Sequence, residues 1–233
     1  MTRLTFEPGT DYRPVWSPDG SAIVYSGEEG IFRKASSGAG QPERLMQGRG
    51  IVNDLSRDGR LLLFERSGRN TGMDVSVLPL EGDRKPEPFL ESRFVEMASR
   101  FSPDGRWVAY ASDESGKREV YVQGFTRGKP ASGVRWQISS GGALHPAWRG
   151  DGKELFYLTL EGKLMAVTVA AAGTAFRYGT PVALFDTRIA SPNSRWEYDV
   201  TADGQRFLLV EPARQTESRP LTMVINWQAG LKR

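Results

Sequence analysis

Short apolar runs follow tight-turn sequences at five places along the chain. In the clearest case, Phe101–Tyr110, the turn Ser102-Pro103-Asp104-Gly105 separates two stretches of strand-forming residues. Proline at the second turn position has the fixed φ of a type I turn, and glycine at the fourth tolerates a positive φ. Related turns are Ser17–Gly20, Ser56–Gly59, Arg149–Gly152 and Thr201–Gly204. The pattern therefore predicts five β-hairpins.

The turn aspartates recur at intervals of roughly 40 to 50 residues, which is typical of propellers and solenoids. Positions four to six after each aspartate are all apolar or tyrosine: Ile23–Tyr25, Leu62–Phe64, Val108–Tyr110, Leu155–Tyr157 and Phe207–Leu209. A continuous apolar run bounded by turns indicates a strand buried on both faces. Blades stacked face to face around an axis bury their strands in this way. We therefore expect an all-β propeller of four-stranded antiparallel blades.

Third and fourth strands are expected after each hairpin. The third strands are Gly30–Lys34, Asp74–Leu78, Glu119–Gln123, Leu164–Thr168 and Leu221–Ile225. The outer strands are Glu43–Met46, Glu87–Leu90, Arg135–Ile138 and Pro181–Phe185, and Pro88 and Pro181 suit an edge. In three repeats the residue three positions before the turn aspartate is aromatic, namely Trp16, Phe101 and Trp148. We expect these residues to be buried between blades.

The fifth unit ends without an outer strand of its own. Arg3–Phe6 resembles an outer strand with no blade before it, so we expect it to pair with Leu221–Ile225 and to close a ring of five blades. Residues 1–233 then form one domain, with repeats 9–46, 47–91, 92–139, 140–186 and 187–233 and with 2–6 closing the ring. The alternative is part of a six-bladed or larger ring.

The repeats resemble the TolB-like, WD-like bacterial propeller repeat through Arg13-Pro-Val-Trp-Ser-Pro-Asp-Gly20, and the resemblance covers nearly the whole chain. Residues 102–122, 151–167, 198–208 and 221–233 are similar to the C-terminal propeller region of acidobacterial-type serine/threonine protein kinases. This resemblance implies an extracytoplasmic sensory or interaction domain of a bacterial membrane protein. The chain has no Gly-rich kinase loop, His-Arg-Asp or Asp-Phe-Gly sequence, so the resemblance implies no phosphoryl transfer.

Composition narrows the class of partner. Thirty-one basic and 28 acidic residues give a net charge of +3, and the charges are scattered along the chain. Nucleic-acid binding favours lysine and arginine concentrated on one face, so we expect no nucleic acid. The chain has no cysteine, which excludes disulfides, thiol catalysis and cysteine zinc sites. We expect a monomer with a protein partner of unknown identity.

No segment approaches the ~18 apolar residues that a spanning helix needs, so we expect no membrane insertion by this chain. Met1–Pro8 lacks the apolar core of a signal peptide. Two interpretations remain, a cytoplasmic protein or a fragment whose export signal or membrane anchor lies upstream. The compartment stays open.

His145 is the only histidine, so a hydrolase triad or a histidine metal site would have to use it. One interpretation is a ligand or proton-transfer residue at the mouth of a channel. The other is a loop imidazole that caps Trp148 or the backbone. No Gly-x-Ser-x-Gly sequence accompanies it.

Polar residues gather on one side of the predicted inner strands. Residues four and six positions before each turn aspartate should share a side, because strand side chains repeat every second residue. The polar ones, which we predict as ligand-binding residues of the axial channel, are Arg13, Asp54, Arg100, His145, Glu197 and Asp199. Such a set could hold calcium, an anionic ligand or a peptide. Alternatively, Asp54, Arg100 and Asp199 pair with one another or with turn backbones.

The leading hypothesis is a non-enzymatic propeller that binds a protein or small ligand at its channel face and loops. We predict no catalytic residues and no cofactor, apart from the calcium alternative in the channel. The alternative is a propeller hydrolase or lyase, or a gating domain of a peptidase. A catalytic propeller should collect histidine, tyrosine, arginine and carboxylates at one mouth, and this chain has a single histidine.

Overall fold

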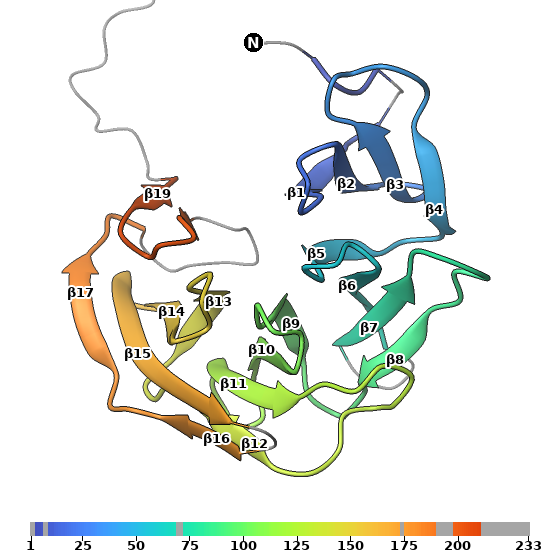
Figure 1. Ribbon diagram of the computed structural model, residues 1–233. Helices are drawn as coiled ribbons and strands as arrows, with labels where there is room; N and C mark the ends of the chain where they lie inside the picture. Colours follow the sequence, from blue (N-terminus) through green and yellow to red (C-terminus); the bar gives the residue numbers. More distant parts are fainter. Residues whose placement is uncertain (1–2, 7–8, 69–71, 173–174, 190–197, 211–233) are drawn as a thin grey trace, which may run out of the picture.

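The computed structural model describes residues 3–6, 9–68, 72–172, 175–189 and 198–210. The regular structure in these ranges consists of nineteen β-strands, grouped into sheets that radiate from a central axis (Figure 1). Within the same ranges there is no helix that is both long and apolar enough to cross a membrane. The expected propeller of four-stranded antiparallel blades is confirmed.

Four sheets follow one another along the chain, each with its strands in sequence order. The first contains β1 (Tyr12–Trp16), β2 (Ala22–Gly27), β3 (Gly30–Ala35) and β4 (Glu43–Gln47). The second contains β5 (Ile51–Leu55), β6 (Leu61–Ser67), β7 (Met73–Pro79) and β8 (Glu87–Leu90). The third contains β9 (Glu96–Phe101), β10 (Trp107–Ser112), β11 (Glu119–Gly124) and β12 (Arg135–Gln137).

The fourth sheet contains β13 (Ala143–Trp148), β14 (Glu154–Thr159), β15 (Lys163–Ala172), β16 (Ala175–Tyr178) and β17 (Val182–Asp186). A hairpin of β18 (Tyr198–Val200) and β19 (Phe207–Leu209) begins a fifth unit. The predicted outer strands correspond to β4, β8, β12 and β17. The predicted pairing of Arg3–Phe6 with Leu221–Ile225 involves residues outside the described ranges, and Arg3–Phe6 itself is not in a strand.

All five predicted turns are present and share one geometry. The glycine N–H donates to the carbonyl oxygen three residues earlier at 2.8 Å in each turn, and the glycine φ lies between 69° and 72°. Each aspartate accepts a hydrogen bond from the backbone N–H two residues later, as Asp104 does from Arg106 at 3.1 Å. The turn aspartates are therefore structural, as their sequence context predicted.

The inner strands are not regular, and this corrects one sequence argument. Pairing between inner and second strands shifts register in the first four sheets. At the shift, Arg13, Ala98 and His145 have φ of 55°, 53° and 56°, a left-handed conformation unusual for residues other than glycine. Because a bulge interrupts the two-residue alternation, positions four and six before the aspartate do not lie on one continuous strand face.

Apolar clusters fill the spaces between successive sheets. The cluster between the second and third sheets contains Phe101, only 6% exposed, and Trp148 packs against the cluster between the third and fourth. Trp16 is 60% exposed, so its predicted burial is wrong. Leu208, at the centre of the fifth predicted run, is 72% exposed. Both residues line one cavity, whose wall includes β1 and β19. Figure 1 shows no described strand between these two strands.

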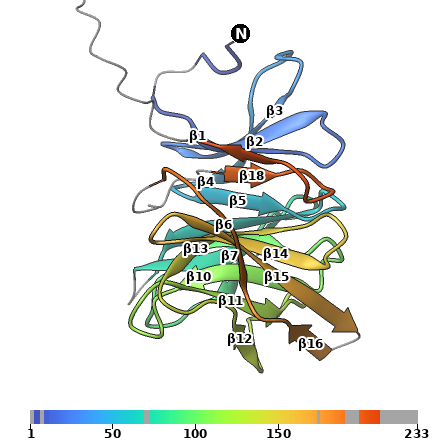
Figure 2. The ribbon, with the colours of Figure 1, turned by 90° about the vertical axis from the view of Figure 1, so that its left-hand side faces the viewer.

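The fourth sheet has an extension that the sequence did not predict. The first part of β15 pairs with β17, whereas Val169–Ala172 pairs with β16. Both views place β16 beside β12 of the third sheet (Figures 1 and 2), and the Tyr178 hydroxyl donates to the Gln137 carbonyl oxygen at 2.9 Å. The β15–β16 hairpin thus reaches across to the neighbouring sheet.

Candidate functional site

The inner strands surround a cavity of about 880 Å³, here called the axial cavity. Its wall comes from β1, β5, β9, β18 and β19, which belong to the first, second, third and fifth units. Four of the six predicted ligand-binding residues line it: Arg13, Asp54, Arg100 and Asp199. The structure therefore brings together charged residues that are far apart in the sequence.

Asp54 and Arg100 form an ion pair across the boundary between the second and third sheets. The Arg100 Nη1 atom lies 3.3 Å from Asp54 Oδ1, and the Phe101 N–H donates to Asp54 Oδ2 at 2.9 Å. Burial raises the pKa of Asp54, while the Arg100 charge and the Phe101 hydrogen bond oppose that rise. The pairing that sequence analysis offered as the structural alternative is thus present for these two residues.

Arg13 lies above a buried carboxylate that sequence analysis did not select. Glu65 of β6 is 2% exposed, and its Oε1 accepts the Ala98 backbone N–H at 2.6 Å. Burial raises the pKa of Glu65, whereas the Arg13 charge and hydrogen bonds from Ala98 and Asn53 lower it. Burial also lowers the pKa of Arg13, and the Glu65 charge opposes this effect. A buried acid thus lies within electrostatic range of an arginine on the cavity wall.

Other polar contacts join neighbouring sheets at the cavity wall. Asn53 Nδ2 donates to Ser99 Oγ at 2.9 Å, and Ser26 Oγ accepts the Val52 N–H at 2.8 Å. Ser26 and Glu65 occupy the same place, seven residues after their turn aspartates. This shared offset, at which a polar residue ends an apolar run, is the sequence signal that could have identified both residues. The contacts link each inner strand to the neighbouring sheet and involve two residues of the cavity wall, Val52 and Asn53.

The remaining two predicted residues are not part of this wall. His145 is 1% exposed, lies within β13 rather than in a loop, and does not line the axial cavity. Its carbonyl oxygen accepts the Tyr198 hydroxyl at 2.6 Å, which joins the fourth and fifth units. The structure therefore does not place this imidazole on the cavity wall, and it lies in a strand rather than in a loop. Glu197 lies outside the described residues.

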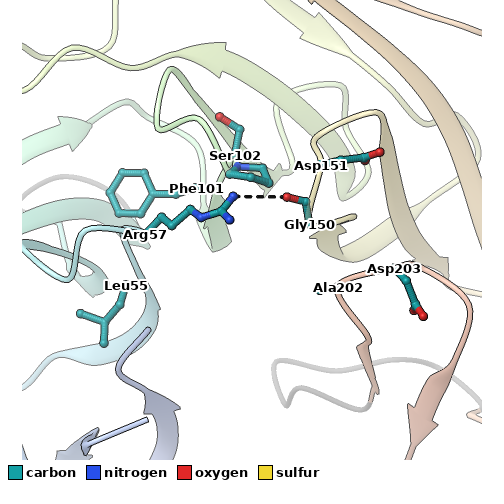
Figure 3. Close-up of a pocket in the computed structure, with 9 residues that line it drawn as sticks. Leu55, Arg57, Phe101, Ser102, Gly150, Asp151, Ala202 and Asp203 are labelled. Atoms are coloured by element: carbon teal, nitrogen blue, oxygen red, sulfur yellow. Dashed lines mark hydrogen bonds between the residues drawn. The ribbon is translucent and has the colours of Figure 1, made fainter. Parts of the chain in front are cut away.

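A second cavity, of about 560 Å³, lies at the end of the ring where the turns meet. Figure 3 shows Arg57 extending from the turn after β5 toward the Gly150 carbonyl oxygen of the fourth sheet, at 3.5 Å. Asp151 and Asp203 also line this cavity, but both accept backbone hydrogen bonds within their own turns. Its carboxylates are thus engaged locally, which makes the axial cavity the stronger candidate site.

The residues that line the axial cavity offer charges that can complement a ligand rather than a set of catalytic groups. Its charged residues are two guanidinium groups and two carboxylates, and one group of each kind is already paired. Among the described residues, no three histidine, aspartate or glutamate side chains are arranged to hold a metal ion. Calcium prefers several oxygen ligands, and the Arg100 guanidinium at Asp54 disfavours it. The arrangement suits a ligand that offers both donors and acceptors.

No protein-family model and no curated sequence matches the chain. Solved structures do match in fold. TolB from Acinetobacter baumannii superposes with a TM-score of 0.61 and 19% identity, over 88% of this chain and 55% of that one. An oligogalacturonate lyase in complex with manganese gives a TM-score of 0.61 and 14% identity, over 93% of this chain and 62% of the lyase.

A periplasmic gluconolactonase from Pseudomonas aeruginosa gives a TM-score of 0.56 and 19% identity, over 82% of this chain and 62% of the lactonase. The chain therefore spans between 55% and 62% of the length of these three proteins. At these identities the similarity establishes the β-propeller fold and not an activity. The fold is shared by TolB and by propellers named for lyase and lactonase activities.

Proposed function

We propose that this chain is a non-enzymatic β-propeller binding module whose axial cavity receives a segment of a protein partner or a small ligand. The observation that carries the proposal is the convergence of Arg13, Asp54, Arg100 and Asp199 on one cavity. These residues come from four separate inner strands. Because charge in a partly desolvated cavity needs a counter-charge, such a wall selects ligands by electrostatic complementarity.

The position of the one histidine supports binding rather than catalysis. His145 is buried away from the cavity, and Asp54 is occupied by Arg100 and by a backbone N–H. A general base must lie within hydrogen-bonding reach of the proton that it removes. The cavity groups are instead placed to hold a ligand in one orientation.

The similarity of several segments to kinase-associated propellers supports a finer proposal. On that proposal the module is the extracytoplasmic sensory part of a larger bacterial signalling or envelope protein. Sequencing the gene upstream of Met1 checks this point, and a cytoplasmic enzyme domain unrelated to kinases would contradict it.

Peptide selection tests the binding role. A phage-displayed random peptide library is selected on the wild-type protein, and the recovered peptides are titrated by calorimetry against two double variants. Asp54→Asn with Asp199→Asn should weaken binding at least about tenfold, which corresponds to roughly 1.4 kcal/mol. Asp83→Asn with Asp186→Asn removes the same charge from exposed positions outside the cavity and should leave binding unchanged.

Circular dichroism first establishes that both double variants keep the wild-type fold. Arg13→Gln provides a second test that leaves the ion pair between Asp54 and Arg100 intact. Equal binding by wild type, the Asp54 and Asp199 variant, and Arg13→Gln would exclude the axial cavity as the site. Turnover of a sugar lactone or of oligogalacturonate that is lost in the same variants would replace the binding role with the enzymatic alternative.

A further inference from the structure

A groove of about 670 Å³ lies between the third and fourth sheets and shares no lining residue with the axial cavity. Residues of β15, of β16 and of the turn before β14 meet Trp107 and Trp148 along it. We call it the interblade groove, and the residues that matter here are Trp107, Trp148, Lys153, Ala170 and Arg177. The role proposed above does not use these residues.

The β15–β16 hairpin builds one side of the groove and is firmly attached. Phe176 of β16 packs 5.1 Å from the ring centroids of Trp107 and Trp136, and 6.4 Å from that of Trp148. Strand β17 already supplies the outer strand of the fourth sheet, so the extension is not needed to complete the blade. It instead encloses space beside the third sheet, which is typical of an insertion with a function of its own.

The two carboxylates of the groove are engaged within the protein. Asp104 accepts hydrogen bonds from Ser102 Oγ and from the Arg106 Nε, and its Oδ2 lies 2.6 Å from Arg106 Nη2. Asp151 accepts the Lys153 backbone N–H and pairs with Arg149 at 3.2 Å. Neither carboxylate is therefore the main recognition group for a ligand.

Two cationic side chains remain available to a ligand. Lys153 and Arg177 are exposed, and neither side chain forms an ion pair within the described part of the chain. Both carry positive charge, so the groove calls for an anionic acceptor.

We propose that the interblade groove binds a small organic anion, in which a carboxylate or phosphate group is attached to an apolar ring. Lys153 and Arg177 would bind the anionic group, since arginine recognises carboxylate and phosphate through parallel hydrogen bonds. The apolar ring would contact Val169, Ala170, Ala171 and Trp148, whose side chains line the groove. The small alanine side chains on the extension leave the room that such a ring needs.

Calorimetric titration with four probes tests the proposal. Phenyl phosphate and benzoate carry the two anionic groups on the same ring, benzyl alcohol carries the ring without charge, and inorganic phosphate carries charge without the ring. At least one of the first two should bind ten or more times tighter than benzyl alcohol and inorganic phosphate. The tighter of the two identifies the anionic group that the groove prefers.

Variants then locate the binding. Lys153→Gln with Arg177→Gln should weaken the preferred probe at least tenfold, whereas Lys129→Gln with Lys163→Gln removes the same charge from exposed positions elsewhere. Ala170→Phe should fill the groove and weaken binding without changing charge. Failure of both anionic probes to bind, equal binding of benzyl alcohol, or unchanged affinity in the groove variants would overturn the proposal.

Discussion

Phe101 and Trp16 occupy the same place in two repeats, three residues before the turn aspartate, yet they lie in opposite environments. Phe101 is 6% exposed between the second and third sheets, and its ring lies 5.1 Å from that of Phe125. Trp16 is 60% exposed and lines the axial cavity. The repeat sequence therefore specifies the strand and its turn, whereas the burial of a residue depends on whether a neighbouring sheet covers it.

The largest expected difference comes from truncating these two side chains. Phe101→Ala should destabilise the protein by about 3 to 5 kcal/mol, because it removes a packed aromatic ring and leaves a cavity. Trp16→Ala should cost less than about 1 kcal/mol, because most of that side chain is already solvated. Urea unfolding of both variants measures the difference. Equal losses would show that Trp16 is covered in solution.

A pH-dependent effect should follow from Glu96, which lies at the boundary between the second and third sheets. It is 3% exposed and hydrogen-bonded to Ser92, and burial raises its pKa to about 7. The charges of Asp74 and Asp113 contribute to this rise, whereas the Ser92 hydrogen bond and the Arg135 charge oppose it. When a carboxyl group has a higher pKa in the folded state, the protein loses stability as pH rises from the unfolded pKa to the folded one.

Glu96→Gln should therefore stabilise the protein at pH 8 by on the order of 2 kcal/mol and change little at pH 4, where Glu96 is protonated in the folded protein and mostly protonated in the unfolded one. Glu43 of the first sheet is the matched control with the opposite sign. Hydrogen bonds from Arg33 and Arg84 lower its pKa, so Glu43→Gln should destabilise at neutral pH and less at pH 4. Thermal melts across pH 4 to 8 distinguish the two. A Glu96→Gln effect that is independent of pH would contradict the assignment.

Removing a largely buried ion pair and removing an exposed one should change the free energy of unfolding by amounts that differ less than those above. Asp54→Ala leaves Arg100 and the Phe101 N–H without their acceptor, so we expect a loss of about 1 to 2 kcal/mol. Glu81→Ala removes a 3.7 Å contact with Arg60 in which both side chains are well exposed, and should cost less than about 0.5 kcal/mol. Chemical denaturation measures both, and a loss from Asp54→Ala no greater than that from Glu81→Ala would contradict this account.

Local sequence chemistry was sufficient to predict the strands of the first four sheets, apart from β16 and the second half of β15. The turns depend on Asp-Gly pairs whose geometry is nearly the same in every repeat, and the apolar runs mark β6, β10 and β14 directly. The β15–β16 extension was missed because Val169–Tyr178 mixes alanine with polar residues and has no turn signal like that of the repeats. Its strand character depends on Phe176 packing against the third sheet.

The candidate site was predicted only in part, for a related reason. Asp54, Arg100 and Asp199 share an offset from their turns, and equal offsets place residues at equal heights around the axis. Arg13 and His145 share the other offset and are both left-handed residues at a bulge, but only Arg13 lines the cavity, so that offset alone does not place a residue on the wall. Glu65 was missed because its partners, Ala98 and Arg13, belong to other sheets.

The bulged inner strands also bear on the order in which the protein folds during synthesis. Ser26 of the first sheet accepts the N–H of Val52 in the second, and Glu65 of the second accepts that of Ala98 in the third. In both cases the acceptor belongs to the sheet that leaves the ribosome earlier. Because chains begin folding from the N-terminal side as they are made, each completed sheet already offers the group that the next inner strand requires, and blades can be added one after another.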